Sequence, residues 1–168
     1  LAVCLSCGFV FNRTYDKSLL EYGKEYDNKQ TCSPLFGEYL SGLIDYLIRE
    51  KGLRGKRIVE VGCGNGGFLK ELCRRGNNRG VGFDPSYRGP RTLQDGRLRF
   101  RAEMFPPASR IAPADAVICR HVIEHELDPV RLLQSLRRCV HPDSSGLLFF
   151  ETPSVEWIFQ AGAFWDFF

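Results

Sequence analysis

The sequence lacks long apolar runs and has no strong excess of charge of either sign. None of its apolar stretches approaches the roughly 18 residues that a membrane-spanning helix needs, and no signal peptide is visible. Lysine and arginine together number 23 and aspartate and glutamate 20, which gives a formal net charge of only +3. This balance is too even to indicate nucleic acid as a partner. We therefore expect a soluble, cytoplasmic protein that binds neither nucleic acid nor a membrane.

The sequence also lacks internal repeats, low-complexity tracts and the paired cysteines of a disulfide framework. Its seven cysteines are an odd number, and four of them lie in apolar segments, at Cys63, Cys73, Cys119 and Cys139. Reduced thiols inside an intracellular protein fit this pattern better than disulfide bonds do.

The length and composition of the chain are those of a single globular domain. Of its 168 residues, 43% are apolar, 26% charged and 12% aromatic, values that exclude collagen-like, coiled-coil and wholly disordered proteins. The chain begins at Leu1 rather than at methionine and ends in an aromatic cluster at residues 164–168. Because an exposed tail does not favour such large apolar side chains, we expect an excerpt from a longer protein.

Strand and helix patterns alternate along most of the chain. Ser33 and Pro34 form a helix-start signal, and apolar residues recur at helical spacing from there to Gly52. The pattern then predicts strands at 57–63, 80–84, 98–105, 114–120 and 146–151, and helices at about 68–75 and 129–140. Strands separated by helices favour an α/β fold with a Rossmann-like, doubly wound and mostly parallel sheet.

The most informative segment joins the first of these strands to its helix. Its loop, residues 62–67, holds four glycines: Gly62, Gly64, Gly66 and Gly67. Glycines allow the backbone to approach a ligand closely, and the helix N-terminus offers free N–H donors at the positive end of the helix dipole. A polar or anionic part of a cofactor is expected to bind there.

Two cofactors fit this loop. Gly62, Gly64 and Gly67 satisfy the dinucleotide pattern G-x-G-x-x-G, and Asp84, at the end of the next strand, could bind a ribose diol as an NAD site requires. Taking Gly66 in place of Gly67 gives the pattern G-x-G-x-G. Glu60 stands two residues before Gly62, the first glycine of this pattern. A carboxylate there would repel a pyrophosphate, whereas it suits a cofactor that carries an ammonium or sulfonium group.

At this point the sequence resembles the class I S-adenosylmethionine-dependent methyltransferases, whose first motif is similar to residues 59–66. The resemblance implies that Gly62, Cys63, Gly64 and Gly66 approach the methionine part of the cofactor, and that Glu60 binds its polar end.

Three later segments match the same family in order and spacing. Residues 82–86 resemble the second motif, which implies that Asp84 binds the ribose hydroxyls. Residues 102–105 stand where the family flanks the adenine, which implies roles for Glu103 and Met104. Residues 115–125 resemble the fourth strand and its loop, and place Arg120 and His121 at the rim of the pocket.

Residues 121–125 also match the zinc peptidase signature H-x-x-E-H. That motif needs a regular helix beneath its two histidines, His121 and His125. Here a buried strand precedes the motif, and Asp128 and Pro129 follow within four residues, which leaves room for about one helical turn. We therefore favour a position at the pocket rim over a metallopeptidase site.

The start of the chain contains half of a possible zinc site. Cys4 and Cys7 form a C-x2-C-G knuckle with Gly8, although reduced thiols are the alternative, since two thiolates do not complete a structural site. With the residues that follow, this segment resembles the C-methyltransferases that have an N-terminal zinc-binding domain. The resemblance implies that residues 1–30 are a remnant of that domain with its linker, and that residues 31–168 are a truncated methyltransferase domain. It also implies that Tyr26 and Ser33 lie near the methionine end of the cofactor.

The narrower resemblance favours a small-molecule acceptor, the carbon of a nucleotide-linked keto sugar. Such a reaction needs a general base, and no residue of this chain is a convincing candidate, because the expected acid/base segment lies past residue 168. The catalytic residues, the oligomeric state and the activity of such an excerpt are therefore not predicted. An NAD-dependent oxidoreductase and a non-catalytic cofactor-binding module are the alternative functions.

Overall fold

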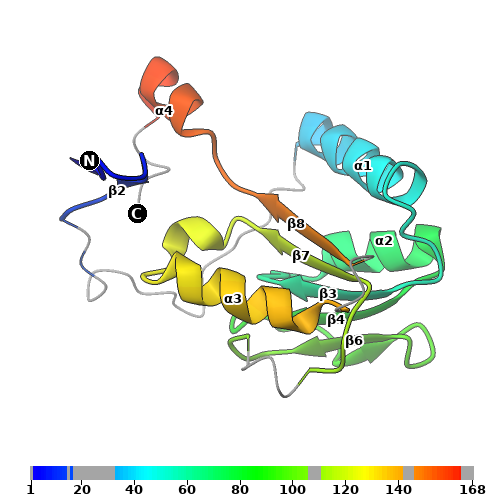
Figure 1. The fold of residues 1–168 in the computed structure, drawn as a ribbon. Helices are drawn as coiled ribbons and strands as arrows, with labels where there is room; N and C mark the ends of the chain where they lie inside the picture. Colours follow the sequence, from blue (N-terminus) through cyan, green and yellow to red (C-terminus); the bar gives the residue numbers. More distant parts are fainter. Residues whose placement is uncertain (1, 15, 17–32, 106–110, 142–145, 164–168) are drawn as a thin grey trace.

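A mostly parallel six-stranded sheet forms the centre of the computed structural model, which describes residues 2–14, 16, 33–105, 111–141 and 146–163 (Figure 1). Its strands follow the order β5-β6-β4-β3-β7-β8, and every neighbouring pair is parallel except β5 and β6. The strands are β3 (Arg57–Val61), β4 (Arg79–Phe83), β5 (Thr92–Leu93), β6 (Leu98–Arg101), β7 (Ala116–Arg120) and β8 (Leu147–Glu151). The predicted α/β, Rossmann-like and doubly wound fold class is thus confirmed.

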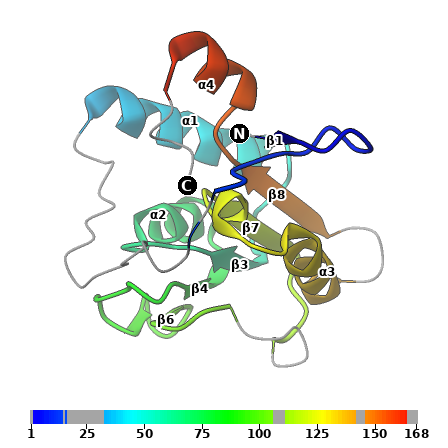
Figure 2. The same cartoon turned by 90° about the vertical axis from the view of Figure 1, so that its left-hand side faces the viewer.

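Helices cover both faces of the sheet. Helices α1 (Pro34–Arg49) and α2 (Gly67–Gly76) lie on one face, and α3 (Pro129–Cys139) lies on the other (Figures 1 and 2). Because both faces are covered, successive residues of β3 point into different cores: Ile58 packs with the first two helices and Val59 with α3. This explains why the strands appear in the sequence as continuous apolar runs rather than as alternating ones.

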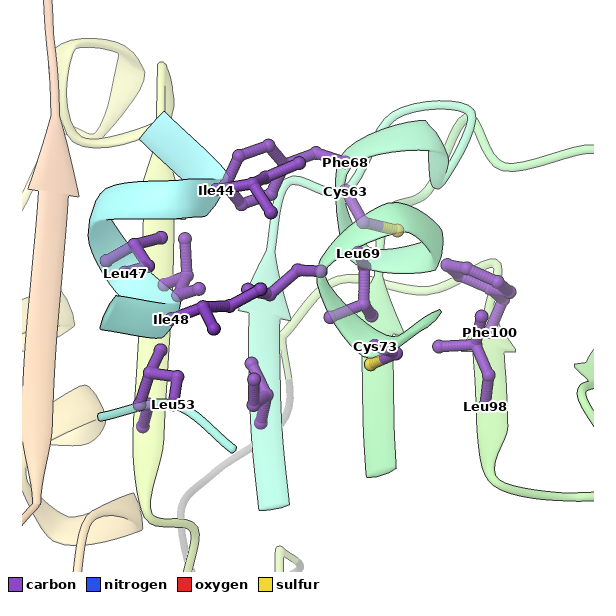
Figure 3. Close-up of a cluster of buried hydrophobic side chains, with 14 of the residues drawn as sticks. Ile44, Leu47, Ile48, Leu53, Cys63, Phe68, Leu69, Cys73, Leu98 and Phe100 are labelled. Carbon is purple, nitrogen blue, oxygen red and sulfur yellow. The ribbon is translucent and has the colours of Figure 1, made fainter. Parts of the chain in front are cut away.

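Helix α1 forms as its start signal predicts. The Ser33 hydroxyl accepts a hydrogen bond from the Phe36 N–H at 3.4 Å, and Pro34 occupies the first helical position. Ile44, Leu47 and Ile48 of this helix are buried against side chains of α2 and of the sheet (Figure 3). The helix is therefore fixed on the sheet by a continuous apolar contact.

Two short segments complete the described fold. Strands β1 (Ala2–Val3) and β2 (Val10–Phe11) form an antiparallel hairpin, and helix α4 (Val155–Ala161) follows β8. No helix among the described residues is long and apolar enough to cross a membrane. The division of the chain at residue 30 stays a prediction, since residues 17–32 lie outside the described ranges.

The observed strands differ from the predicted ones mainly at their ends. The strand predicted at 98–105 ends at Arg101, because Arg101 is paired with Phe83, the last residue of the neighbouring strand β4. The strand predicted at 57–63 ends at Val61, since Gly62 has a φ of 71°. Strand β5 and helix α4 were not predicted.

Candidate functional site

The candidate site lies at the carboxyl ends of β3, β4 and β7. Strand β4 is on one side of β3 and β7 is on the other, so the chain changes direction across the sheet at β3. In open α/β sheets ligands bind at such a switch point, beyond the carboxyl ends of the strands. The glycine loop, Asp84 and Arg120 all follow these three strand ends.

The loop conformation distinguishes between the two glycine patterns. Gly62, Gly64 and Gly66 have φ values of 71°, 52° and 76°, in the left-handed region that favours glycine, whereas Gly67 is the first residue of helix α2 and is not among the positive-φ residues. An added Cβ would overlap the Val122 side chain at Gly62 and the Phe100 ring at Gly66. The backbone therefore requires the alternating pattern G-x-G-x-G.

Asp84 connects the end of β4 to this loop. Its Oδ2 atom accepts the Gly64 N–H at 2.7 Å, while Oδ1 accepts the N–H and the hydroxyl of Ser86 at 2.7 and 2.6 Å. Each carboxylate oxygen has two lone pairs, so Oδ2 keeps one acceptor site. The carboxylate both holds the loop and has capacity left for a ligand hydroxyl.

Glu60 is the unusual residue of the site. Its side chain is only 2% exposed, and its buried Oε2 atom has no hydrogen-bond partner in the part of the chain that the structure describes. Desolvation raises the pKa of this carboxyl to about 8; the charge of Arg120 and the Leu69 N–H lower it, and the charge of Asp84 raises it further. A buried acid with an unpaired oxygen thus lies directly beneath the loop.

Arg120, at the end of β7, pairs with Glu151 rather than with Glu60. Its Nε lies 2.5 Å from Glu151 Oε2, and its guanidinium lies 4.3 Å from the centre of the Phe68 ring. The register explains the pair, because Arg120 and Glu151 are Cα partners at the ends of β7 and β8. The same carboxylate accepts the Tyr39 hydroxyl of α1 at 2.8 Å.

His121 is held between two carboxylates. Its Nδ1 lies 3.6 Å from Glu124 Oε1 and its Nε2 lies 3.3 Å from Glu151 Oε1, contacts that raise the pKa of the imidazole to about 9 against the effect of burial. In Glu151, desolvation is outweighed by hydrogen bonds from His121, Arg120 and Tyr39, which lower the pKa to about 2. The His121 imidazolium and the Glu151 carboxylate are therefore charged at neutral pH.

The H-x-x-E-H segment does not form the helix that a zinc peptidase needs. His121 has a φ of 51°, and Ile123–His125 is a single 3-10 turn, η4. Among the described parts of the chain, no group of three or more histidine, cysteine or acidic side chains could hold a metal ion. The segment therefore lacks the regular helix of the zinc peptidase motif, and the position of His121 at the rim of a cofactor pocket stays a prediction.

The remaining predicted residues have varied surroundings. Cys63 is buried, and burial raises the pKa of its thiol. Glu103 and Met104 are exposed just past β6, beside Asp84, whose N–H donates to the Arg101 carbonyl at 3.1 Å. The Ser33 hydroxyl caps α1, and Tyr26 lies outside the described residues.

Cys4 and Cys7 form a turn within the N-terminal hairpin. The Cys4 N–H donates to the Phe9 carbonyl, the Gly8 N–H donates to the Cys4 carbonyl, and Gly8 has a φ of 74°. Hydrogen bonds from the backbone of Ser6 and Cys7 lower the pKa of the Cys4 thiol. The two sulfurs are free thiols within a knuckle-like turn.

Sequence reasoning missed Glu151, Tyr39, Glu124 and Ser86 as parts of this site. Ser86 stands two residues after Asp84, a spacing at which a carboxylate commonly accepts the hydrogen bonds of an Asx turn, so a local signal was present. Glu151 contacts Arg120 and Tyr39, which are 31 and 112 residues away. No local pattern could have indicated these two contacts.

Comparison with known proteins gives consistent matches. A family model described as a methyltransferase domain matches residues 35–166. A ubiquinone biosynthesis O-methyltransferase of Neisseria meningitidis serogroup C is 29% identical over 151 residues, covering 84% of this chain and 59% of that protein. A tRNA U34 carboxymethyltransferase of Campylobacter hominis is 30% identical over 118 residues, covering 62% of this chain and 38% of that protein.

The chain thus spans three fifths or less of the length of these curated relatives. Among solved structures, the N-methyltransferase NodS of Bradyrhizobium japonicum WM9, in complex with S-adenosylhomocysteine, is similar with a TM-score of 0.57 and 15% identity, over 83% of this chain and 74% of that one. The methyltransferase domain of bacterial CtHen1-CN gives 0.54 and 21% identity, over 79% and 74%. Both share the fold described above.

Proposed function

The chain belongs to the class I S-adenosylmethionine-dependent methyltransferases, and from that premise we propose that S-adenosylmethionine binds at the carboxyl ends of β3, β4 and β7. In this proposal Glu60 binds the cofactor ammonium, the loop of residues 62–66 passes along the methionine part, and Asp84 binds the ribose hydroxyls. Glu103 and Met104 flank the adenine. Arg120 and His121 lie beside the methionine end.

The observation that supports this assignment best is the unpaired oxygen of Glu60. A buried carboxyl without a partner is costly unless a ligand completes its hydrogen bonds, and an ammonium group would do so. Of the three left-handed glycines, Gly64 has no atom within 4 Å of an added Cβ, so the loop is open to a ligand at that residue. Both features fit a cofactor with a cationic end.

When bound, the cofactor supplies a methyl group on a cationic sulfur, which a nucleophile displaces in line. The chain's contribution is to hold and orient the reacting groups, which accounts for a large part of the rate in such reactions. Asp84 fixes the loop through the Gly64 N–H, and Arg120 is fixed by Glu151 and Phe68. These contacts preset the geometry before either reactant binds.

An NAD-dependent oxidoreductase is the weaker alternative. Its pyrophosphate would lie against the glycine loop and would offer no positive charge with which the Glu60 carboxyl could pair, whereas an ammonium group would. The loop also has its third left-handed residue at Gly66 and not at Gly67. A non-catalytic cofactor-binding module remains the other alternative, since a general base has not been identified.

We propose a small molecule as the methyl acceptor. The matched relatives are named for ubiquinone biosynthesis and for tRNA, and none of those names supports the keto-sugar carbon that the N-terminal resemblance suggests. That finer assignment therefore depends on Cys4 and Cys7 being the last ligands of a zinc domain. Adding zinc to this chain is not expected to produce tight binding, because two thiolates leave the metal half coordinated.

Thermal-shift measurements with S-adenosylhomocysteine and with NAD test the proposal. We expect the first ligand to raise the melting temperature and NAD to leave it unchanged. Replacing Asp84 by Ala should weaken binding of S-adenosylhomocysteine by about 1.5–3 kcal/mol, the scale of a hydrogen bond to a charged group. Ser86→Ala, which keeps the carboxylate, is the control and should bind nearly as well as the wild type. Stabilisation by NAD, or unchanged affinity in Asp84→Ala, would contradict the assignment.

A further inference from the structure

Among the residues that the structure describes, Glu60 makes no ion pair, although the cation of Arg120 lies close enough to affect its charge. The charge of Arg120 acts on the Glu60 carboxyl, yet its guanidinium makes its ion pair with Glu151 and stacks on the Phe68 ring. A carboxylate that is buried without an ion pair is strongly disfavoured, and such a group takes up a proton instead. The geometry alone therefore favours a neutral Glu60.

Within the described ranges, no other group close to Glu60 supplies a cation, and the Leu69 N–H of α2 is a neutral donor to its carboxyl. Strand β4 contributes Asp84, whose charge opposes ionisation of Glu60, and the loop, α2 and β7 contribute the thiols of Cys63, Cys73 and Cys119. Burial raises the pKa of all three thiols, so they are neutral. The side chains that β6 places in the core on this face of the sheet, Leu98 and Phe100, are apolar. Helix α1 contributes Tyr39, whose hydroxyl donates its hydrogen bond to Glu151.

Glu151 keeps Arg120 engaged because it stays ionised at any physiological pH. Two donors bind its oxygens, Arg120 Nε at 2.5 Å and the Tyr39 hydroxyl at 2.8 Å, and His121 Nε2 lies 3.3 Å from Oε1. The Arg120 and Glu151 side chains are only 10% and 15% exposed, so water screens their attraction weakly. Glu151 is thus well placed to hold the guanidinium away from Glu60.

We propose that Glu151 is a positioning residue which, by holding Arg120, keeps Glu60 protonated in the empty site, and that Glu60 releases this proton when the ammonium end of the cofactor binds. The step is a simple acid dissociation, in which the Glu60 O–H bond breaks, the proton passes to the buffer, and the new carboxylate pairs with the ligand ammonium. It rests on the proposed function, because it requires S-adenosylmethionine or its product to bind here. The pKa of about 8 for Glu60 supports a neutral resting state at pH 7.

Calorimetry counts this proton directly. We expect titration of S-adenosylhomocysteine into the chain at pH 7, in two buffers with different heats of ionisation, to show release of about one proton per bound ligand. Glu60→Gln has no proton to release and should bind with the same heat in both buffers. The ligand 5′-methylthioadenosine has the nucleoside and the thioether but no ammonium, so its binding to the wild type should release none.

Glu151→Gln tests the positioning role. Removing the charge of Glu151 lets Arg120 turn to Glu60, which would then be ionised before the ligand arrives. We expect the proton count to fall toward zero and the affinity for S-adenosylhomocysteine to drop about tenfold, while 5′-methylthioadenosine binds as before. A role in folding alone would weaken both ligands and leave the proton count unchanged. Glu71→Gln, on the outer face of α2 and paired with Arg74, is the matched control and should behave as the wild type.

The outcomes separate this inference from the proposed function. If S-adenosylhomocysteine does not bind, the proposed function is wrong; if it binds without releasing a proton, only the inference is wrong. Should Glu60→Gln fail to fold, the pH dependence of wild-type affinity decides the matter. Coupled release predicts that affinity rises with pH between about 6 and 8, by up to tenfold per pH unit, and a flat profile would overturn the proposal.

Discussion

A buried polar side chain lies near each end of the sheet, and the two side chains differ in how completely they are hydrogen-bonded. In the part of the chain that the structure describes, Glu60 and Asn78 are the buried polar side chains. Asn78, before the start of β4, donates to the carbonyls of Leu53 and Leu72 at 3.0 and 3.1 Å and accepts the Lys56 N–H at 2.9 Å. Glu60, at the other end of β3, leaves an oxygen without a partner.

This difference separates a group that stabilises the fold from one that is available to a ligand. The amide of Asn78 joins α2, the loop before β3 and the start of that strand, so its contribution is complete in the free protein. The carboxyl of Glu60 becomes fully hydrogen-bonded only when something else enters the site. Buried polar groups in folded proteins are nearly always hydrogen-bonded, and the described atoms without a partner include Glu60 Oε2, His121 Nε2 and Glu124 Oε2, all three in side chains at the candidate site.

The largest expected effect is a loss of stability at Asn78, near the amino ends of the strands. Asn78→Ala would remove three buried hydrogen bonds, to the Leu53 and Leu72 carbonyls and from the Lys56 N–H, and we expect unfolding free energy to fall by about 3 kcal/mol. Chemical denaturation at pH 7 measures this loss. Asn77→Gly removes an exposed neighbour whose φ of 52° suits glycine, and it should change stability little. Equal losses in the two variants would contradict the role given to Asn78.

A smaller effect is expected at the glycine loop. Gly62→Ala would add a methyl group that overlaps Val122, at a φ of 71°, and should cost about 2 kcal/mol of unfolding free energy. Gly64→Ala has the same backbone problem, with no atom within 4 Å of the added carbon, and should cost about 1 kcal/mol. Urea denaturation of the two variants compares them, and an equal loss would show that Val122 gives way.

The smallest effect concerns the charges around His121. Its pKa of about 9 lies above the ordinary value of 6.5, so the imidazolium stabilises the fold fully below pH 6.5 and loses this contribution as pH rises through 9. Because its side chain is 33% exposed, we expect His121→Asn to be less stable at pH 6 by under about 1 kcal/mol. Melting curves should show the gap to the wild type closing by pH 9.5. A gap that widens with pH would refute the charged state given to His121.

The sequence was sufficient to predict the features that depend on local patterns. These features are the alternating strands and helices, the cap at Ser33 and the turn at Gly62. Each depends on residues that are close together in the sequence, and each appears in the structure near its predicted position. The ambiguity between Gly66 and Gly67 required backbone angles, because both glycines fit a known pattern.

The contacts that set the charge state of the site could not be predicted in this way. Arg120 meets Glu151 only because β7 and β8 are parallel neighbours in one register. Tyr39 reaches the same carboxylate from helix α1, 112 residues earlier in the sequence. The sequence shows the charged residues but not which of them form pairs.

The most direct test of the account is the number of protons released when S-adenosylhomocysteine binds at pH 7, measured by calorimetry in two buffers for the wild type and for Glu60→Gln. If the unpaired carboxyl of Glu60 is the place of the cofactor ammonium, the wild type releases about one proton and the variant none. Equal counts for the two proteins, with binding intact in both, would contradict the release of a proton from Glu60 on binding.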